Sequence, residues 1–202
     1  SLNFYTGAQL NQYNINPGSL DPGSGNSIIP VDLENEGSRE LSIYGSLNWN
    51  PTERLSISSG IRLTNFSLLG PYNQGQYDEN GIFKGIKEFS DNEVVVNYFN
   101  PEPRIGVNYK LGENSALKAS YASIYQYIQN IYNTSTPLPT SRWKMSDTFI
   151  LPQKNDTYGL GWYKNYKSTG LEISSEAYYR KTENNLTYKP GADFFLSEFL
   201  ER

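Results

Sequence analysis

Two long runs of alternating apolar and polar residues lie between Asn155 and Asp193. Successive side chains of a β-strand point to opposite faces, so such alternation predicts a strand with one apolar and one polar face. In the second run the apolar face holds Leu171, Ile173, Ser175, Ala177 and Tyr179, and the polar face holds Glu172, Ser174, Glu176, Tyr178 and Arg180. The first run places Tyr158, Leu160 and Trp162 on its apolar face. A globular sandwich can use such a hairpin, but a membrane barrel requires one, because lipid meets one face and a polar lumen the other.

The same alternation predicts five further strands, and the connections between strands differ regularly in length. These strands are expected at residues 2–13, 39–50, 55–64, 104–111 and 117–122. Short turns are expected at 51–54, at 112–114 and inside the last hairpin, whereas long loops are expected at 14–38, 67–101, 126–154 and from Asn184 onward. Outer-membrane barrels have short periplasmic turns and long extracellular loops. A soluble sandwich has mixed loop lengths instead. We therefore predict an all-β, antiparallel, up-and-down transmembrane β-barrel segment of about seven strands.

Seven strands do not close a bacterial barrel, whose strand number is even. An open sheet edge in lipid would leave unpaired backbone groups, each costing several kcal/mol. We therefore expect residues 1–202 to be part of a single larger barrel domain whose closing strands lie elsewhere. The first residues, SLNFYTGAQL, are strand-like and lack a basic leader region, so the chain is expected to begin inside a longer protein.

The composition excludes several classes of site. The 202 residues include no Cys and no His, which excludes disulfides, thiolate nucleophiles, Ser-His-Asp triads and the usual zinc sites. A net charge of -4 without any Lys/Arg cluster argues against nucleic acid as a partner. We predict neither an enzyme nor a cofactor. Asp78-x-Asn80-Gly81 resembles the start of a calcium loop, but the later acidic ligand is missing, so the Asn-Gly pair is better interpreted as a type I′ turn inside a small hairpin.

Three sets of side chains are candidates for a functional role. Recognition residues concentrate on loops that a rigid scaffold holds, so the third loop supplies the ligand-contact candidates: Tyr125, Gln126, Tyr127, Asn133, Arg142, Trp143 and Lys144. The charged residues of the polar faces could line a solute path, or instead contact an internal domain or solvate the lumen: Arg62, Arg104, Lys110, Lys118, Glu172 and Glu176. The large residues of the apolar faces are expected to meet lipid, with an aromatic sugar platform as the alternative: Leu47, Trp49, Tyr109, Tyr158, Trp162 and Tyr179.

The second half of the chain also resembles a known family. The strings that carry the resemblance are NPEPRIGVNYKL (100–111), LKASYASIYQYIQNI (117–131), NTSTPLPTSRWKMSD (133–147), LPQKNDTYGLGWYKN (151–165) and LEISSEAYYRKTENNLTYKPGA (171–192). Together they are similar to the barrel of Bacteroidetes TonB-dependent receptors with a carboxypeptidase-regulatory-like domain ahead of the plug. The resemblance implies a 22-stranded barrel, a plug domain and a TonB box, of which the plug and TonB box are not in this sequence.

The resemblance implies a function in the outer membrane of a Gram-negative bacterium. It implies import of a nutrient such as a glycan, a peptide or a metal chelate. The implied partners are outer-membrane lipid, the protein's own plug, the TonB complex and a surface lipoprotein. One alternative is a receptor-like barrel that scaffolds surface lipoproteins or assembly machinery without transport. A second is a soluble surface adhesin with a sandwich fold.

Overall fold

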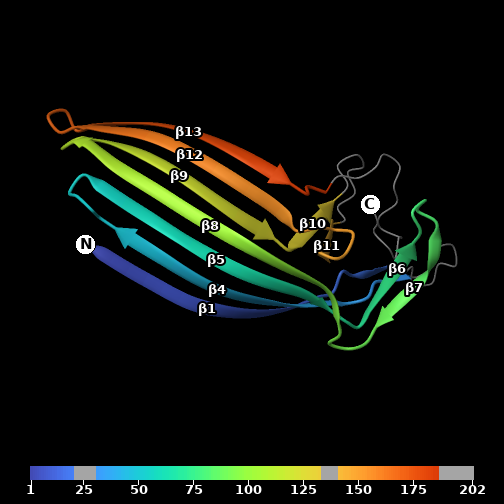
Figure 1. Ribbon diagram of the computed structural model, residues 1–202. Coiled ribbons are helices and arrows are strands. Elements are labelled where there is room, and N and C mark those ends of the chain that lie inside the picture. Colours follow the sequence, from blue (N-terminus) through green and yellow to red (C-terminus); the bar gives the residue numbers. More distant parts are fainter. Residues whose placement is uncertain (21–30, 133–140, 187–202) are drawn as a thin grey trace.

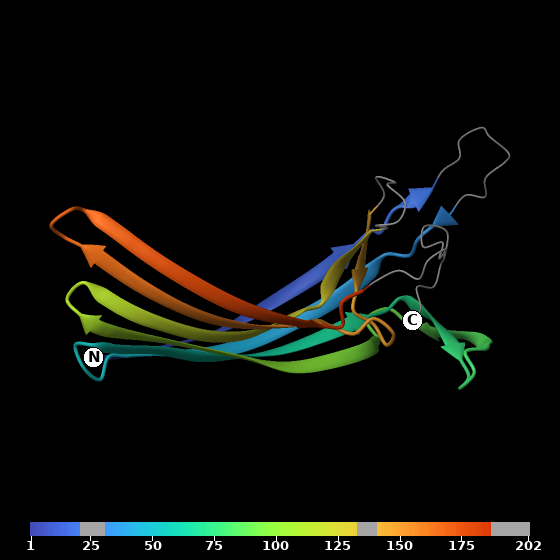
Figure 2. The same ribbon diagram turned by 90° about the horizontal axis from the view of Figure 1, so that it is seen from above.

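The computed structural model describes residues 1–20, 31–132 and 141–186. Its main feature is one antiparallel sheet of seven long strands in the order β1-β4-β5-β8-β9-β12-β13. These strands are β1 (Leu2–Ile15), β4 (Glu36–Trp49), β5 (Leu55–Leu69), β8 (Val94–Gly112), β9 (Ser115–Gln126), β12 (Gln153–Tyr166) and β13 (Leu171–Glu183). The sheet is curved and hollow on one side (Figure 2). The expected fold class is confirmed, and a single sheet does not fit the two packed layers of the sandwich alternative.

Short turns lie at one end of the sheet and long connections at the other (Figure 1). At the turn end, β4 joins β5 through residues 50–54, where the Thr52 hydroxyl accepts the backbone N–H groups of Arg54 and Leu55 at 3.3 and 3.0 Å. At the loop end three small hairpins add six strands: β2 (Ser19–Leu20), β3 (Val31–Asp32), β6 (Tyr72–Tyr77), β7 (Phe83–Phe89), β10 (Ile128–Tyr132) and β11 (Ser141–Met145). The described ranges hold no helix that is long and apolar enough to cross a membrane.

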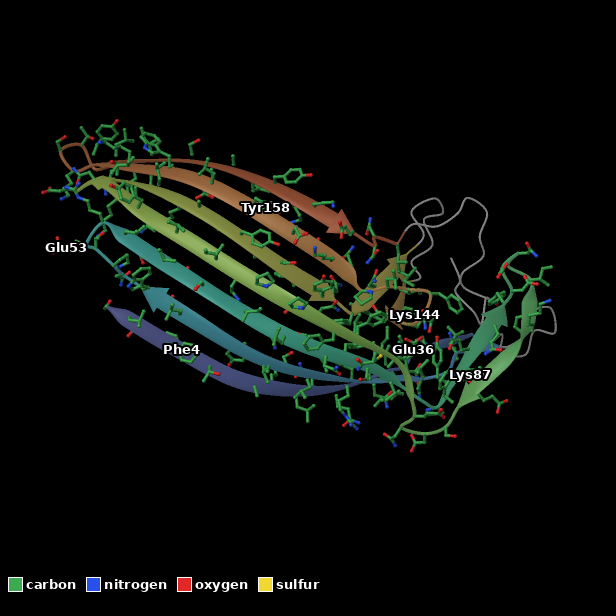
Figure 3. All side chains as sticks on the ribbon, viewed as in Figure 1. Phe4, Glu36, Glu53, Lys87, Lys144 and Tyr158 are labelled. Atoms are coloured by element: carbon green, nitrogen blue, oxygen red, sulfur yellow. The ribbon has the colours of Figure 1, made fainter. Side chains whose placement is uncertain are left out.

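The registers place the expected apolar residues on one face of the sheet. Tyr158 pairs with Tyr179 and with Tyr121, and the three rings form a ladder with centroid distances of 4.9 and 6.3 Å. Toward the loop end this face becomes polar: Lys154 and Asp156 form an ion pair at 2.9 Å on β12. Aromatic rings bordered by charged side chains are typical of the membrane–water boundary. We call the sheet of seven long strands the wall. Figure 3 shows Phe4 and Tyr158 on the wall, Glu53 at the turn end, and Lys144 with Glu36 at the loop end.

Strand β8 begins earlier than the sequence predicts. The expected loop over 67–101 contains the β6–β7 hairpin but ends at Val94, so Pro101 and Pro103 lie inside a strand. Prolines are tolerated in a strand where no ladder hydrogen bond is required of them. The ladder between β8 and β9 starts at Arg104, so the residues before it pair only with β5. The side chain of Glu102 replaces part of the missing ladder by accepting the backbone N–H of Tyr125 at 2.8 Å.

The β6–β7 hairpin corrects the predicted turn and provides no evidence for calcium. Gly81 has a positive φ of 77°, whereas Asn80 does not, so the turn is not type I′. Asp78 organises it: its carboxylate Oδ1 accepts the N–H groups of Asn80 and Ile82 at 3.0 and 2.9 Å, and Oδ2 pairs with Lys84 at 3.0 Å. These contacts occupy the carboxylate that the calcium alternative needed. In the described part of the chain no group of three or more acidic, His or Cys residues is arranged to hold a metal ion.

Candidate functional site

The third long connection folds onto the polar face of the sheet at the loop end. We call residues 127–131 and 143–151 the cap; Figure 2 shows its β10–β11 hairpin on the hollow side of the sheet. Tyr127 stacks on Phe66 with centroids 4.7 Å apart and ring planes 5° apart. Met145 and Leu68 complete this buried core, and further residues pack around it: Tyr13, Ile15, Tyr72, Val95, Val96, Tyr98, Tyr125 and Ile128.

The chemistry of β5 explains why the core forms there. On the polar face this strand carries Ser56, Ser58, Arg62 and Thr64, but the next two residues of the same face are Phe66 and Leu68. Both side chains are fully buried, because the cap removes them from solvent. Burying such a side chain contributes roughly 1.5–3 kcal/mol. The lumen-facing side of the sheet is therefore polar along the wall and apolar under the cap.

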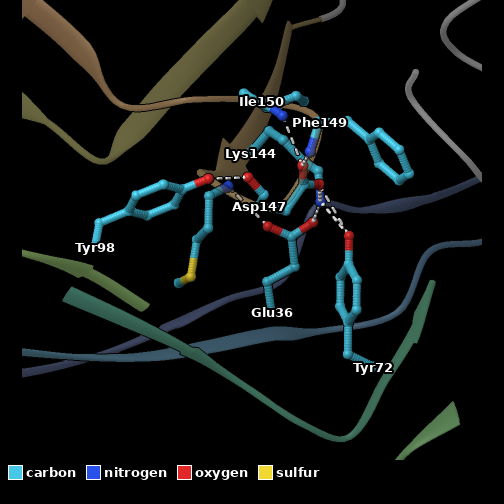
Figure 4. Close-up of polar contacts among 8 residues, drawn as sticks. Glu36, Tyr72, Tyr98, Lys144, Asp147, Phe149 and Ile150 are labelled. Carbon is cyan, nitrogen blue, oxygen red and sulfur yellow. Dashed lines mark hydrogen bonds and ion pairs between the residues drawn. The ribbon is translucent and has the colours of Figure 1, made fainter. Parts of the chain in front are cut away.

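A buried cation lies at the centre of the cap. Lys144 Nζ lies 2.6 Å from Glu36 Oε1 and 3.1 Å from Asp147 Oδ2, and it donates to the Tyr72 hydroxyl at 3.1 Å (Figure 4). We call Glu36, Tyr72, Lys144 and Asp147 the Lys144 network. The side chains of Lys144, Glu36 and Asp147 are each about 3–4% exposed. Charges buried this deeply are costly unless they are paired and hydrogen-bonded.

Every carboxylate oxygen of the network has a donor. Glu36 Oε2 accepts the backbone N–H of Met145 at 2.8 Å. Asp147 Oδ1 accepts the N–H groups of Phe149 and Ile150 at 2.8 and 2.7 Å, and the Tyr72 hydroxyl donates to Asp147 Oδ2 at 3.0 Å. The Tyr98 hydroxyl donates to the backbone carbonyl of Asp147 at 2.5 Å. This completeness lets one cation and two anions stay buried together.

The electrostatics agree with this pairing. Burial alone would lower the pKa of Lys144, but Glu36 and Asp147 outweigh it and raise that pKa above its usual value. Burial also raises the pKa of the Tyr72 phenol, which stays protonated beside the cation. The network therefore has a fixed protonation state at physiological pH: Lys144 charged and Tyr72 neutral.

The structure separates the ligand-contact candidates into two groups. Tyr127 and Lys144 are buried in the cap, and Tyr125 is half-buried beside it. Trp143, however, is 50% exposed, and Gln126 is exposed, with its side chain donating to the Ile128 carbonyl at 2.8 Å.

Two more candidates lie wholly or partly outside the described structure. The backbone of Arg142 pairs with Ile131 in the β10–β11 ladder, but its side chain is not described. Asn133 lies outside the described residues.

Sequence reasoning missed the partners of Lys144. The sequence predicts long loops at Glu36 and Tyr72, and Asp147 ends a string that carries the family resemblance but indicates no ion-pair partner. The spacing between Glu36 and Lys144 is 108 residues, so no local pattern joins them. The one usable signal was the replacement of polar by aromatic and aliphatic residues at Phe66 and Leu68, on a face that is otherwise hydrophilic.

The expected polar face forms a groove along the wall. Tyr163 donates to Glu176, and Lys118 lies over the Tyr163 ring at 4.2 Å from its centroid. With the small residues Ser58, Gly106, Ser120 and Gly159 they line a hollow of about 340 Å³. Arg62 pairs with Gln9 and lies over the Tyr44 ring, farther along the same face. The registers place the six charged residues predicted for this face on it, whereas the outer face carries charge toward the loop end, at Lys154 and Asp156. The groove offers hydrogen-bonding groups along the wall.

Comparisons with known proteins agree with this architecture. The family model "TonB dependent receptor-like, beta-barrel" matches residues 1–198. Among solved structures, the alcaligin outer-membrane receptor FauA from Bordetella pertussis is similar, with 20% identity and a TM-score of 0.45 over 80% of this chain. The match covers 23% of the FauA chain, so this chain spans about a quarter of that length. No curated protein matches. The chain belongs to the TonB-dependent receptor β-barrel family, whose members are transporters of the Gram-negative outer membrane rather than enzymes.

Proposed function

We propose that the chain forms part of the wall of a receptor that imports a nutrient, such as a glycan, a peptide or a metal chelate, with energy supplied through TonB. The observation that carries this proposal is the two-sided wall: an apolar outer face, and a polar inner face with a groove of about 340 Å³. The cap covers only the loop end of that inner face. A solute that passes the cap would therefore meet hydroxyl, amide and charged groups along the wall.

The finer assignment rests on the sequence strings quoted above. We propose a receptor of the Bacteroidetes type, with a carboxypeptidase-regulatory-like domain and a plug ahead of a 22-stranded barrel. Its partners would be membrane lipid at the apolar face, the plug at the polar face, the TonB complex through the N-terminal part, and a surface lipoprotein at the loops.

Recognition is proposed at the exposed side of the cap. Trp143 offers a half-exposed ring, and Asn130, opposite it in the β10–β11 ladder, offers an exposed amide. The Lys144 network and the Phe66 core hold this surface rigid from below. A rigid aromatic ring beside a hydrogen-bonding group suits ligands that have both flat apolar and polar faces. Tyr127 and Lys144 would contribute by supporting this surface.

Energised uptake in the native full-length receptor is the test. Cells expressing it are given labelled oligosaccharides, peptides or metal chelates, with and without an intact TonB box. The proposal predicts accumulation of at least one class that stops when the TonB box is removed while the barrel remains in the outer membrane. Failure of every class to accumulate, with the barrel correctly inserted, would contradict import.

A scaffold barrel is the second candidate function. The cap favours this function, because Tyr127 and Lys144 are buried and a packed core covers the loop end. A scaffold would retain a tightly bound surface lipoprotein through purification and show no TonB-dependent uptake. An importer would show uptake whether or not such a lipoprotein is retained.

A further inference from the structure

The three partners of Lys144 come from three separate segments at the loop end of the sheet. Glu36 lies at the loop-end start of β4, after the β1–β4 connection. Tyr72 belongs to β6, within the β5–β8 connection. Lys144 and Asp147 belong to the β9–β12 connection. One ammonium group, with its three donors, therefore joins the first residue of β4 to the β5–β8 and β9–β12 connections.

Other contacts join the same connections in pairs. Asn73 donates to Glu34 Oε1 at 2.6 Å, which links β6 to the segment before β4. The Tyr77 and Phe149 rings meet edge to face at 6.1 Å, which links β6 to the segment after β11. Because these contacts are independent of Lys144, the three connections touch around the network as well as through it.

A buried ion network joins such segments in one specific arrangement. Replacing a buried ion pair by apolar residues of similar volume is often neutral or stabilising, whereas removing one partner alone is strongly destabilising. A buried cation with three acceptors thus adds little net stability but accepts only one arrangement of its partners. If Glu36 and the segment that carries Lys144 move apart, Glu36 is left buried without its cation, whereas displacement of Tyr72 removes a hydroxyl acceptor from Lys144.

We propose that the Lys144 network is a joint that makes the start of β4, strand β6 and residues 143–150 move as one unit. A ligand or partner that displaces one of these segments would then change the order of the other two. This coupling is independent of the proposed import and applies equally to a scaffold barrel.

Hydrogen–deuterium exchange of the native full-length protein tests the joint. Lys144→Met removes the cation, and Lys84→Met is the matched control, because the ion pair of Lys84 with Asp78 lies within the β6–β7 hairpin. We expect Lys144→Met to speed exchange about tenfold or more in residues 33–38, 70–77 and 143–150 together, with β12 and β13 unchanged. Faster exchange confined to 143–150 would overturn the proposal. The control should affect residues 78–84 alone.

Tyr72→Phe keeps the test decisive if Lys144→Met does not assemble. This change removes one hydroxyl from β6 and leaves all three ions and all backbone contacts in place. The joint predicts faster exchange of the Phe149 and Ile150 amides, which bind the carboxylate that Tyr72 also contacts. Unchanged exchange at these two amides would show that β6 and the cap are not coupled.

Discussion

The wall and the cap of this molecule are stabilised in different ways. In the wall, neighbouring strands pair along long antiparallel ladders and many large side chains point outward, as do Leu160 at 61% and Tyr179 at 64% exposure. In the cap, Phe66, Leu68 and Met145 are fully buried, and an ion network joins residues more than 100 positions apart. The wall thus depends on backbone pairing and the lipid around it, whereas the cap has the packed interior of a small soluble domain. Substitutions should consequently behave oppositely in the two regions.

The largest difference is expected for a charge on the outer face of the wall. Leu160→Lys places an ammonium group against lipid, at a cost of about 2–4 kcal/mol near the midplane. We expect barrel assembly in the outer membrane to fail, as measured by the loss of heat-modifiable gel mobility. Tyr178→Lys is the control, because Tyr178 lies on the polar face of the neighbouring strand and is 80% exposed. Normal assembly of both variants would contradict the assignment of the faces.

Truncating a ring should affect the cap more than the wall. Phe66→Ala leaves a cavity under Tyr127 and should destabilise the cap by about 3–5 kcal/mol. Phe4→Ala on the outer face removes a ring that is 69% exposed, where lipid chains can fill the space. Limited proteolysis should cleave residues 127–151 faster in Phe66→Ala while the wall stays intact. Equal protection of the cap in the two variants would refute its packed core.

Trp143→Ala sharpens the comparison by testing the exposed side of the cap. Since the ring is half exposed, assembly should remain normal. If the ring contacts ligand, affinity should fall about tenfold, or about 1.4 kcal/mol, in a binding or uptake measurement. Trp49→Ala, at the turn end of the wall, should leave affinity unchanged. Unaltered affinity in Trp143→Ala would mean that this ring has only a packing role.

The smallest effect is expected at the exposed β6–β7 turn. Hydrogen bonds from the Ile82 N–H and from Lys84 lower the pKa of Asp78 below its usual value. A lowered folded pKa means that the carboxylate stabilises the turn above the usual Asp value of about 3.9 and loses this effect as pH falls through the lowered pKa. The Ile82 amide resonance should therefore titrate with a midpoint below about 3.9. A midpoint at or above that value would show that these bonds do not form in solution.

The wall could be predicted from the sequence because its determinants are local. Alternation with period two shows which residues share a face, so all seven long strands and the faces of Tyr158, Lys118 and Glu176 were expected. Where local sequence patterns predicted the wrong structure, contacts with distant residues determined the observed strand or turn. Pro101 was expected at the end of a loop but lies in β8, where β5 alone pairs with it. Asn80-Gly81 correctly indicated a hairpin, but Asp78 selected another turn type.

The cap could be predicted only in part for the same physical reason. The third loop is expected to carry the recognition residues, which stays a prediction, and Trp143 is half exposed there. The burial of Lys144 depends on Glu36, Tyr72 and Asp147, whose proximity arises only after the sheet has formed. The spacing of these residues in the sequence does not predict that they contact one another.

A cysteine scan along β13 tests the central assignment, a wall with lipid outside and a polar lumen inside, most directly. Residues 1–202 contain no cysteine, so single substitutions from Leu171 to Arg180 give specific labelling sites in a receptor from which any cysteine elsewhere has been removed. Spin labels at the odd positions should be relaxed mainly by oxygen, which dissolves in lipid, and labels at the even positions by a water-soluble nickel chelate. Accessibility without this alternation, or with the opposite phase, would contradict the proposed wall.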